Sequence, residues 1–484
     1  MQMKTALLSV VIITCMCGCL FQPPKAAEAP QKAIDEEPSN TVQKEDIIKE
    51  DTVEESEPLP VGVMLNVPVK DPTFQDFCTT LDAAKQLGAN YIRMGIAWKW
   101  IEVSPGEFNW ESQSCKKIAA IEERGLTLIP VFKTGKFWGT GHLNEKVPQD
   151  MSYPPADLKD TWNDYGYSTS YYTFINTFMA RYKGHFPYIV IQNEANAPNF
   201  WAGTKEDYIK VLKTAYKAAH DADPQVKVAD SGIASGAWGI VIALEIAEEE
   251  SFDDAVTFLE HYRSKYSEKA RSRKELERIL TQKNALELEE TVDYFFSHYN
   301  TCTDAVNLHF YEDIQMVDNV IMYIKGKMEE NGYTLPLMCN EYGIRANDPS
   351  YDVEGSEHAC EVAKKLVTAL VSELELVIWF SASEINTDKL GLIGEEFSWR
   401  DAAFAFKNTL NLLEGSTFRE KRSSTLYVFE RGKEKIFFFW NSEIEVNCIE
   451  KVLVIDILGN TEEPVCDTTV VVKAGEEPYW VIIT

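Results

Sequence analysis

Short apolar runs alternate with longer amphipathic stretches from Val61 onward, a pattern typical of βα units around a parallel sheet. The runs are almost continuously apolar, as in Leu126–Phe132, which is how strands buried on both faces read. Between them lie helical patterns such as Phe74–Leu87, Cys115–Arg124 and Tyr208–His220. Eight runs are predicted to be strands: Val61–Asn66, Tyr91–Gly95, Leu126–Phe132, Tyr188–Glu194, Val226–Gly232, Ala305–Tyr311, Leu335–Tyr342 and Leu376–Ser381. Eight units over roughly 350 residues predict an α/β fold, a (β/α)₈ TIM barrel over residues 61–414.

Two segments depart from this pattern. Between the fifth and sixth predicted strands, residues 243–299 are rich in Glu, Lys and Arg and are predicted to be a helical insertion. Its place on the loop side of the barrel fits a cover over the site and fits a solvated helical excursion equally well. After about Glu414 the apolar residues alternate with a period of two, so residues 415–484 are predicted to form a small C-terminal β-sandwich. Its predicted strands are Thr425–Phe429, Lys435–Trp440, Val452–Ile457 and Tyr479–Ile483.

The first 60 residues predict export. Lys4 precedes the apolar run Ala6–Ile13, and small residues follow up to Cys19, so residues 1–19 are predicted to be a signal peptide. Gly18-Cys19 is similar to the end of a lipoprotein signal, which predicts lipidation of Cys19 and a cell-surface or extracellular location, with plain secretion as the alternative. Residues 20–60 are acidic and Pro-rich with few large apolar residues, and they are predicted to be a disordered linker.

The net charge, the cysteine count and the spacing of possible metal ligands limit what the chain can bind and how its cysteines can pair. The net charge is −29, and without a basic cluster to replace counterions the chain is not expected to bind nucleic acid. Seven cysteines follow Cys19, an odd number that excludes complete internal pairing. Cys448 and Cys466 could bridge two C-terminal strands, and Cys339 is predicted to be a buried apolar filler. His142, His358 and Asp313 have no metal-ligand spacing, and neither a catalytic metal nor a cofactor is predicted.

The candidate chemistry lies where the predicted strands end, because reactive groups of such barrels sit at the carboxyl ends of the strands. Two carboxylates, Glu194 and Glu341, would face the same mouth. Hydrolysis of a glycosidic bond needs such a pair: one carboxyl protonates the leaving oxygen, and the other attacks or stabilises the developing cation. The remaining candidates at these ends, all predicted to bind substrate, are Arg93, Asn193, His309, Tyr311 and Trp379.

Several candidates also have a structural interpretation, and Glu194 or Glu341 alone could be an ordinary loop carboxylate. Arg93 would keep Glu341 ionised, and an ion pair with a purely structural role would have the same effect. Asn193 would bind the sugar 2-hydroxyl. His309 is a site residue or a satisfied histidine of the barrel wall. Three tryptophans are candidate platforms for sugar rings, although each could equally be a core or rim residue; they are Trp138, Trp201 and Trp379.

Several motifs together resemble glycoside hydrolase clan A, whose members are retaining (β/α)₈-barrel glycosidases. The quoted segments are Tyr91–Trp98, Pro105–Trp110, Gln192–Asn196 and Cys339–Gly343. In that clan an Asn-Glu pair ends strand four and a Glu ends strand seven, which implies that Glu194 is the acid/base and Glu341 the nucleophile. The His309-Phe310-Tyr311 pattern is similar to the His-x-Tyr of family 5 cellulase-type members, whose Tyr contacts the nucleophile.

Residues 193–201 most resemble the corresponding stretch of family 39 β-xylosidases. The similarity covers roughly residues 61–484, since the turn Asp456–Asn460 is similar to one in the clan's C-terminal sandwich. The clan usually has Trp and Pro where this chain has Gln192 and Ala195, which leaves the subfamily and the sugar open.

The resemblance and the carboxylate pair imply a retaining β-glycoside hydrolase acting on oligo- or polysaccharides. Three alternatives stay open from the sequence. The chain could be a non-catalytic carbohydrate-binding or adhesion protein on a degenerate barrel, or a transglycosylase with the same residues. A metal-dependent barrel hydrolase is the third.

Overall fold

The computed structural model describes residues 58–143, 151–345, 351–384, 390–447, 451–464 and 468–484. The chain divides into two units, and Ser56–Thr484 forms the second, compact one. The predicted signal peptide with Cys19, nearly all of the predicted linker, and Cys448 and Cys466 lie outside the described residues. None of the helices in the described part of the chain combines the length and the apolar character that crossing a bilayer would require.

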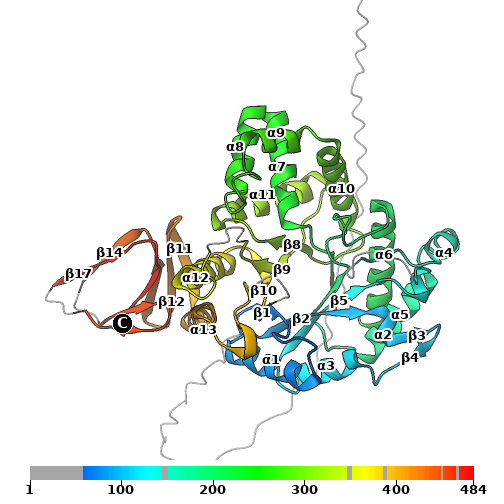
Figure 1. Ribbon diagram of the computed structural model, residues 1–484, viewed down its shortest axis with the longest axis horizontal. Helices are drawn as coiled ribbons and strands as arrows, with labels where there is room; N and C mark the ends of the chain where they lie inside the picture. Colours follow the sequence, from blue (N-terminus) through cyan, green and yellow to red (C-terminus); the bar gives the residue numbers. More distant parts are fainter. Residues whose placement is uncertain (1–57, 144–150, 346–350, 385–389, 448–450, 465–467) are drawn as a thin grey trace, which may run out of the picture. The chain divides into compact units, whose positions relative to one another are not determined.

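A parallel sheet of eight strands forms the centre of this unit (Figure 1). The strands are β1 (Val61–Met64), β2 (Tyr91–Ala97), β5 (Thr127–Lys133), β6 (Tyr188–Ile191), β7 (Lys227–Ala229), β8 (Val306–Phe310), β9 (Leu337–Gly343) and β10 (Leu374–Phe380). They pair in chain order, and β10 pairs with β1. Between β7 and β8 the ladder is reduced to the bridges Ala229–Ala305 and Ile233–Leu308. The predicted (β/α)₈ barrel is confirmed, with a sparse seam between its fifth and sixth strands.

Alternate residues of each barrel strand face two different cores, which explains the continuous apolar runs. On β10, Ile378 lies in the cluster inside the barrel, whereas Val377 and Trp379 lie in the cluster between the barrel and its helices. On β5, Val131 points inward and Phe132 outward in the same way. Because both faces are dry, the strands carry few polar residues, and those inside them, such as Arg93 and Asn307, are buried.

The helices cover the outside of the barrel and include a group that extends the loop after β7. The helices outside this group are α1 (Phe74–Gln86), α2 (Trp98–Ile101), α3 (Gln113–Glu122), α4 (Leu158–Tyr165), α5 (Thr169–Arg181), α6 (Lys205–Ala222), α11 (Val317–Glu330), α12 (Ser356–Val371) and α13 (Asp401–Leu413). The group after β7 comprises α7 (Ser235–Glu249), α8 (Phe252–Tyr262), α9 (Arg273–Leu280) and α10 (Lys283–Tyr299), which gather on one side of the barrel in Figure 1. The helical character predicted for residues 243–299 is thus present, in a group that begins at Ser235.

Helix starts follow local sequence signals. Thr73 and Asp76 form a capping box at the start of α1, in which the threonine hydroxyl accepts from the Asp76 amide and the Asp76 carboxylate accepts from the Thr73 amide. Thr204 and Asp207 do the same for α6. Each box supplies partners for amide groups that a helix start leaves without an acceptor.

The C-terminal region is a two-layer antiparallel structure, which confirms the predicted sandwich. One layer is a six-stranded sheet in the order β11 (Thr417–Ser423), β12 (Leu426–Arg431), β13 (Glu434–Phe439), β18 (Tyr479–Ile483), β15 (Val452–Asp456) and β16 (Thr461–Glu462). The other layer pairs β14 (Ser442–Asn447) with β17 (Thr469–Ala474). Tyr427 and Trp480 face a core shared with α12 and α13, whereas Val428 and Val481 face the second layer.

Candidate active site

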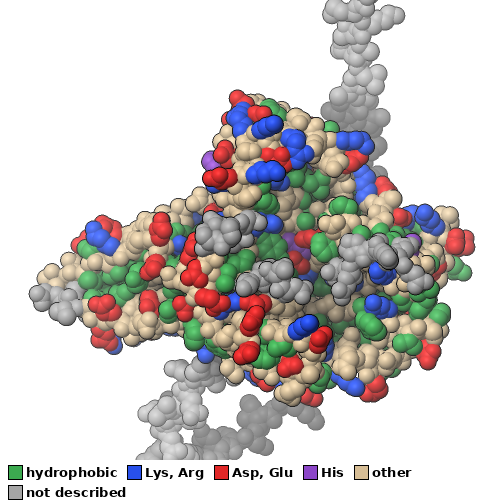
Figure 2. Space-filling model, viewed as in Figure 1, with side chains coloured by type: hydrophobic (Ala, Val, Ile, Leu, Met, Phe, Trp, Pro, Cys, Tyr) green, Lys and Arg blue, Asp and Glu red, His purple; other side chains and the backbone are tan. Residues whose placement is uncertain are grey.

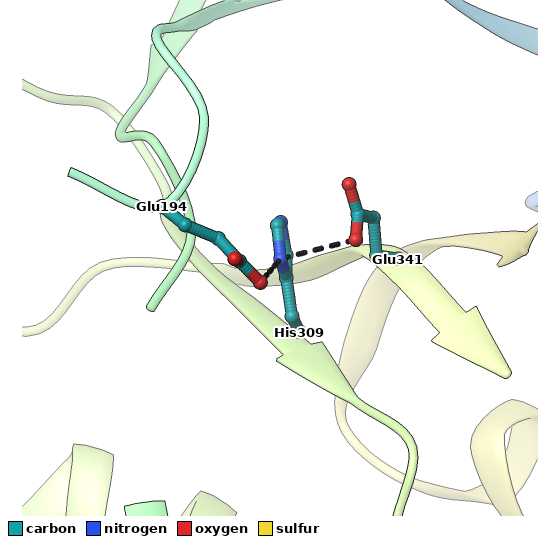
Figure 3. Close-up of side chains that lie close together, drawn as sticks. All are labelled: Glu194, His309 and Glu341. Atoms are coloured by element: carbon teal, nitrogen blue, oxygen red, sulfur yellow. Dashed lines mark hydrogen bonds and ion pairs between the residues drawn. The ribbon is translucent and has the colours of Figure 1, made fainter. Parts of the chain in front are cut away.

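Two carboxylates and one imidazole meet at the carboxyl end of the barrel strands (Figure 3). Glu194 follows β6, His309 lies on β8 and Glu341 lies on β9. One ligand atom from each of the three residues can be chosen so that all lie within 4.8 Å of one another. Glu194 and Glu341, separated by 146 intervening residues (341 − 194 − 1), therefore bring their carboxylate oxygens to less than 5 Å apart.

The imidazole of His309 lies between the two carboxylates, as Figure 3 shows. Its Nδ1 is 2.8 Å from Glu194 Oε1 and 3.3 Å from Glu341 Oε2, and its Nε2 is 2.8 Å from Asn340 Oδ1. Burial opposes the charged form of this fully buried ring, but the negative charges of Glu341 and Glu194 outweigh it and raise the pKa of His309. An oxygen faces each nitrogen, an arrangement in which a doubly protonated ring donates a hydrogen bond from both.

Glu341 is held in its ionised form. Arg93 Nη2 lies 2.7 Å from Glu341 Oε1, and Tyr311 donates its hydroxyl to Glu341 Oε2 at 2.7 Å. Burial alone would raise the pKa of Glu341, but His309 and Arg93 and then the Tyr311 hydrogen bond hold that pKa below its usual value. Arg93 also donates to Asn193 Oδ1 at 2.6 Å, so its guanidinium connects the residue before one carboxylate to the other carboxylate.

The backbone is irregular next to both carboxylates, within β9 at Glu341 and just after β6 at Glu194. Leu308 and His309 of β8 pair with Cys339 and Glu341 of β9. Asn340 is therefore an extra residue on β9, a β-bulge. Its amide donates to Asn307 Oδ1 at 3.1 Å, and this bulge lets Asn340 and Glu341 both point inward. After β6, Gln192 and Glu194 have φ of 70° and 44°, a left-handed conformation that costs non-glycine residues about 1–3 kcal/mol each.

His309 is supported from the seam between β7 and β8. The fully buried Asp230 accepts from the amides of Gly232 at 2.9 Å and Asn307 at 2.7 Å. Burial raises the pKa of Asp230 to about 6, although those two amides act in the opposite direction. Gly232 has φ +71°, and a Cβ built on it would lie 2.4 Å from His309 Nε2. Only a glycine at this position leaves room for the imidazole.

The structure corrects two of the predicted sugar platforms. Trp379 is fully buried in the core outside the barrel, where its ring packs against Phe406 of α13. The prediction placed it in the site because it misjudged which alternate residue of β10 faces inward; the next residue, Phe380, packs its ring against Tyr311 instead. Trp201 is 4% exposed and donates its indole N–H to the Thr204 carbonyl, so its faces cannot receive a sugar.

The third tryptophan, Trp138, keeps partial exposure. Its indole N–H donates to the Glu102 carbonyl at 3.3 Å, and its ring packs edge-on against Trp98. A platform role for Trp138 stays a prediction. Sequence reasoning did not identify Asn340 or Phe380, although both flank predicted site positions at strand ends. Cys339, predicted to be an apolar filler, is fully buried.

Glu194, His309 and Glu341 also have the composition of a metal site, with three ligand atoms inside 4.8 Å. A ligating histidine must offer an unprotonated nitrogen, and both nitrogens of His309 already face oxygen atoms, Glu194 Oε1 and Asn340 Oδ1. Arg93 already supplies a cation to Glu341. Glu341 thus already has a cationic partner, and each nitrogen of His309 already has an oxygen partner.

Comparison with known proteins connects this arrangement to characterised folds. No protein-family model and no curated protein sequence matches the chain. Among solved structures it is similar to a family 39 glycoside hydrolase from the gut symbiont Bacteroides cellulosilyticus WH2, with TM-score 0.59, 16% identity, and 88% of this chain and 81% of that one covered.

Two further structures are similar. A glucosidase from Croceicoccus marinus gives TM-score 0.57 at 12% identity, and a GH39 β-xylosidase from Caulobacter crescentus gives 0.54 at 14%. In both comparisons 88% of this chain and 96% of the other are covered. The chain therefore has the fold of family 39 glycoside hydrolases, a (β/α)₈ barrel followed by a β-sandwich.

Proposed function

We propose that this chain is a retaining β-glycoside hydrolase that cleaves O-glycosidic bonds of oligo- or polysaccharides by double displacement. The observation that supports it is the approach of the Glu194 and Glu341 carboxylate oxygens to within 4.8 Å at the barrel mouth. Retaining enzymes keep their two carboxyl groups about 5–5.5 Å apart, whereas inverting enzymes need a wider gap to admit a water. The names of the similar structures, a glycoside hydrolase, a glucosidase and a β-xylosidase, agree with hydrolysis of a glycosidic bond.

In the first step Glu341 attacks the anomeric carbon as its bond to the leaving oxygen breaks, and Glu194 gives a proton to that oxygen. The sugar is then esterified to Glu341. In the second step a water attacks the same carbon, Glu194 takes the water's proton, and the Glu341 carboxylate leaves. The cations around Glu341 suit this role, because they favour its ionised form before attack and its release afterwards.

Two variants test the assignment on a panel of aryl β-glycosides that includes a xyloside and a glucoside. We expect Glu341→Ala to abolish turnover, while Glu194→Ala regains activity with azide or with a leaving group that needs no protonation. Glu395→Ala, which removes an exposed carboxylate after β10, should leave activity unchanged. Full activity of both site variants on a substrate of the unmodified protein would refute the roles.

A labelling experiment separates the alternatives. A 2-deoxy-2-fluoro glycoside should add one sugar to Glu341, detectable by peptide mass spectrometry, whereas a binding protein on a degenerate barrel would not be labelled. Product analysis with added acceptor sugar distinguishes hydrolysis from transglycosylation. Loss of activity on dialysis against a chelator would instead favour a metal at Glu194, His309 and Glu341.

A further inference from the structure

The helical group after β7 reaches the candidate active site through one buried carboxylate, Glu312. This residue directly follows Tyr311, and its side chain is completely buried. Its Oε1 receives the hydroxyl of Ser235 at 3.0 Å and the hydroxyl of Tyr266 at 3.2 Å, and Arg345 Nε lies 3.3 Å away. A buried carboxylate needs such partners, because an unpaired charge away from water is strongly unfavourable.

The three partners come from three separate segments. Ser235 is the first residue of α7, Tyr266 lies in the connection between α8 and α9, and Arg345 follows β9, the strand that carries Glu341. Of these three partners, only Tyr266 lies within residues 243–299, the predicted helical insertion. Burial and the neighbouring Glu312 charge raise the pKa of Tyr266 to about 12, so its hydroxyl stays protonated and donates.

All of these contacts converge on Tyr311, the hydrogen-bond donor to Glu341. The Tyr311 amide donates to Ser235 Oγ at 2.9 Å, and its carbonyl accepts from the Arg345 amide at 3.0 Å. The Arg345 guanidinium lies 5.7 Å from the centre of the Tyr311 ring and 4.7 Å from that of Tyr266. A cation over a tyrosine ring is attracted by the ring face, so Arg345 joins the two rings.

Glycines on α7 allow this close approach. A Cβ built on Gly236 would lie 3.0 Å from the Tyr266 hydroxyl oxygen, and one on Gly239 would lie 2.3 Å from the Tyr262 ring. Tyr262 in turn donates its hydroxyl to the Ser235 carbonyl at 2.7 Å. The sequence Ser235-Gly236-Ala237-Trp238-Gly239 therefore provides a surface against which two tyrosines of the insertion pack.

We propose that Tyr266, Glu312 and Arg345 are positioning residues that fix Tyr311 against Glu341, which makes the helical insertion a working part of the active site. The proposal rests on the proposed function for its kinetic consequences. None of the three touches a carboxylate of the catalytic pair. They act through Tyr311, whose hydrogen bond favours the ionised form of Glu341.

Tyr266→Phe removes one hydroxyl and keeps the ring. We expect kcat/KM to fall roughly tenfold, the factor for one lost hydrogen bond to a charged group, with KM changed less than about twofold. The acidic limb of kcat/KM against pH should move to higher pH, because a loosened Tyr311 favours the ionised Glu341 less. Tyr294→Phe, a half-exposed tyrosine on α10 of the same helical group, is the matched control and should change neither quantity.

Arg345→Met should lower kcat/KM further, and Arg345→Lys should restore part of the loss and part of the pH shift. A rise in KM with an unmoved acidic limb would instead make Arg345 a substrate contact and would overturn the proposal. So would a Tyr266→Phe variant indistinguishable from Tyr294→Phe.

A readout without substrate separates this proposal from the proposed function. In protein labelled with ¹³C at the glutamate side-chain carboxyl carbon, the Glu341 signal can be assigned by its loss in Glu341→Gln and titrated. The pKa of Glu341 should be higher in Tyr266→Phe than in Tyr294→Phe whether or not the protein hydrolyses any glycoside. Equal values in these two variants would refute the positioning role alone.

Discussion

Replacing Gly232 with alanine tests whether His309 must lie where the structure places it. The alanine Cβ would lie 2.4 Å from His309 Nε2, whereas ordinary contact begins at 3.4 Å. The ring must therefore move by about 1 Å (3.4 − 2.4), and a misplacement of about 1 Å in a catalytic site can cost about 100-fold. We expect kcat/KM of Gly232→Ala to fall by about that factor.

The matched control is Gly125→Ala. Gly125 has φ +68°, close to the +71° of Gly232, but a Cβ there meets nothing within 4 Å. Both variants incur the left-handed penalty of about 1–2 kcal/mol, and only Gly232→Ala adds overpacking of about 1–3 kcal/mol. Urea denaturation should show that difference, and kcat/KM of Gly125→Ala should stay near the unmodified value. Equal activities of the two variants would falsify the claim that His309 needs this position.

Two further predictions concern charge and location. His309→Gln removes a cation that lowers the pKa of Glu341, so the acidic limb of kcat/KM should move to higher pH; an unmoved limb would mean that another group titrates there. We also propose that Cys19 is lipidated and tethers the protein at the cell surface. Cys19→Ser should abolish incorporation of radiolabelled palmitate and release the protein from the membrane fraction, and retained membrane association would contradict the anchor.

The barrel could be predicted because its strands are buried on both faces. All eight predicted strands overlap observed ones, and the few polar residues inside them, such as Arg93 and Asn307, did not hide the apolar runs. In the C-terminal sandwich, the pattern did not predict β11 (Thr417–Ser423), because it is a mostly exposed, charged edge strand without apolar alternation. Charged edges of this kind protect a sheet from pairing with other chains.

On the face shown in Figure 2, basic side chains are scattered among acidic ones.

What the sequence could not supply is the phase of each strand and the contacts between distant segments. The choice between Trp379 and Phe380 depends on which alternate residue of β10 points inward, and both read as aromatic ends of one apolar run. The bulge at Asn340 changes which residues of β9 face inward, and it lies within the segment Cys339–Gly343 that resembles the clan. Tyr266 lies in the polar connection between α8 and α9, and nothing in the nearby sequence connects it with Glu312.

The backbone provides an argument for a functional site that does not depend on resemblance. Among the described residues, six non-glycine residues have positive φ, and two of them, Gln192 and Glu194, flank Asn193. A bulge at Asn340 precedes the other carboxylate. Such conformations cost about 1–3 kcal/mol each and persist where the surroundings enforce them.

Buried charge is concentrated at the same end of the barrel, since Arg93, His309 and Glu341 are all nearly inaccessible to water. A barrel selected only for stability would replace them with apolar side chains, because well-packed apolar groups often match or exceed a buried ion pair in stability. Irregular backbone and buried charge thus occur together where the carboxylate oxygens of Glu194 and Glu341 approach to within 4.8 Å. That coincidence is expected if these residues are retained for chemistry, whereas carbohydrate binding alone does not require both carboxylates.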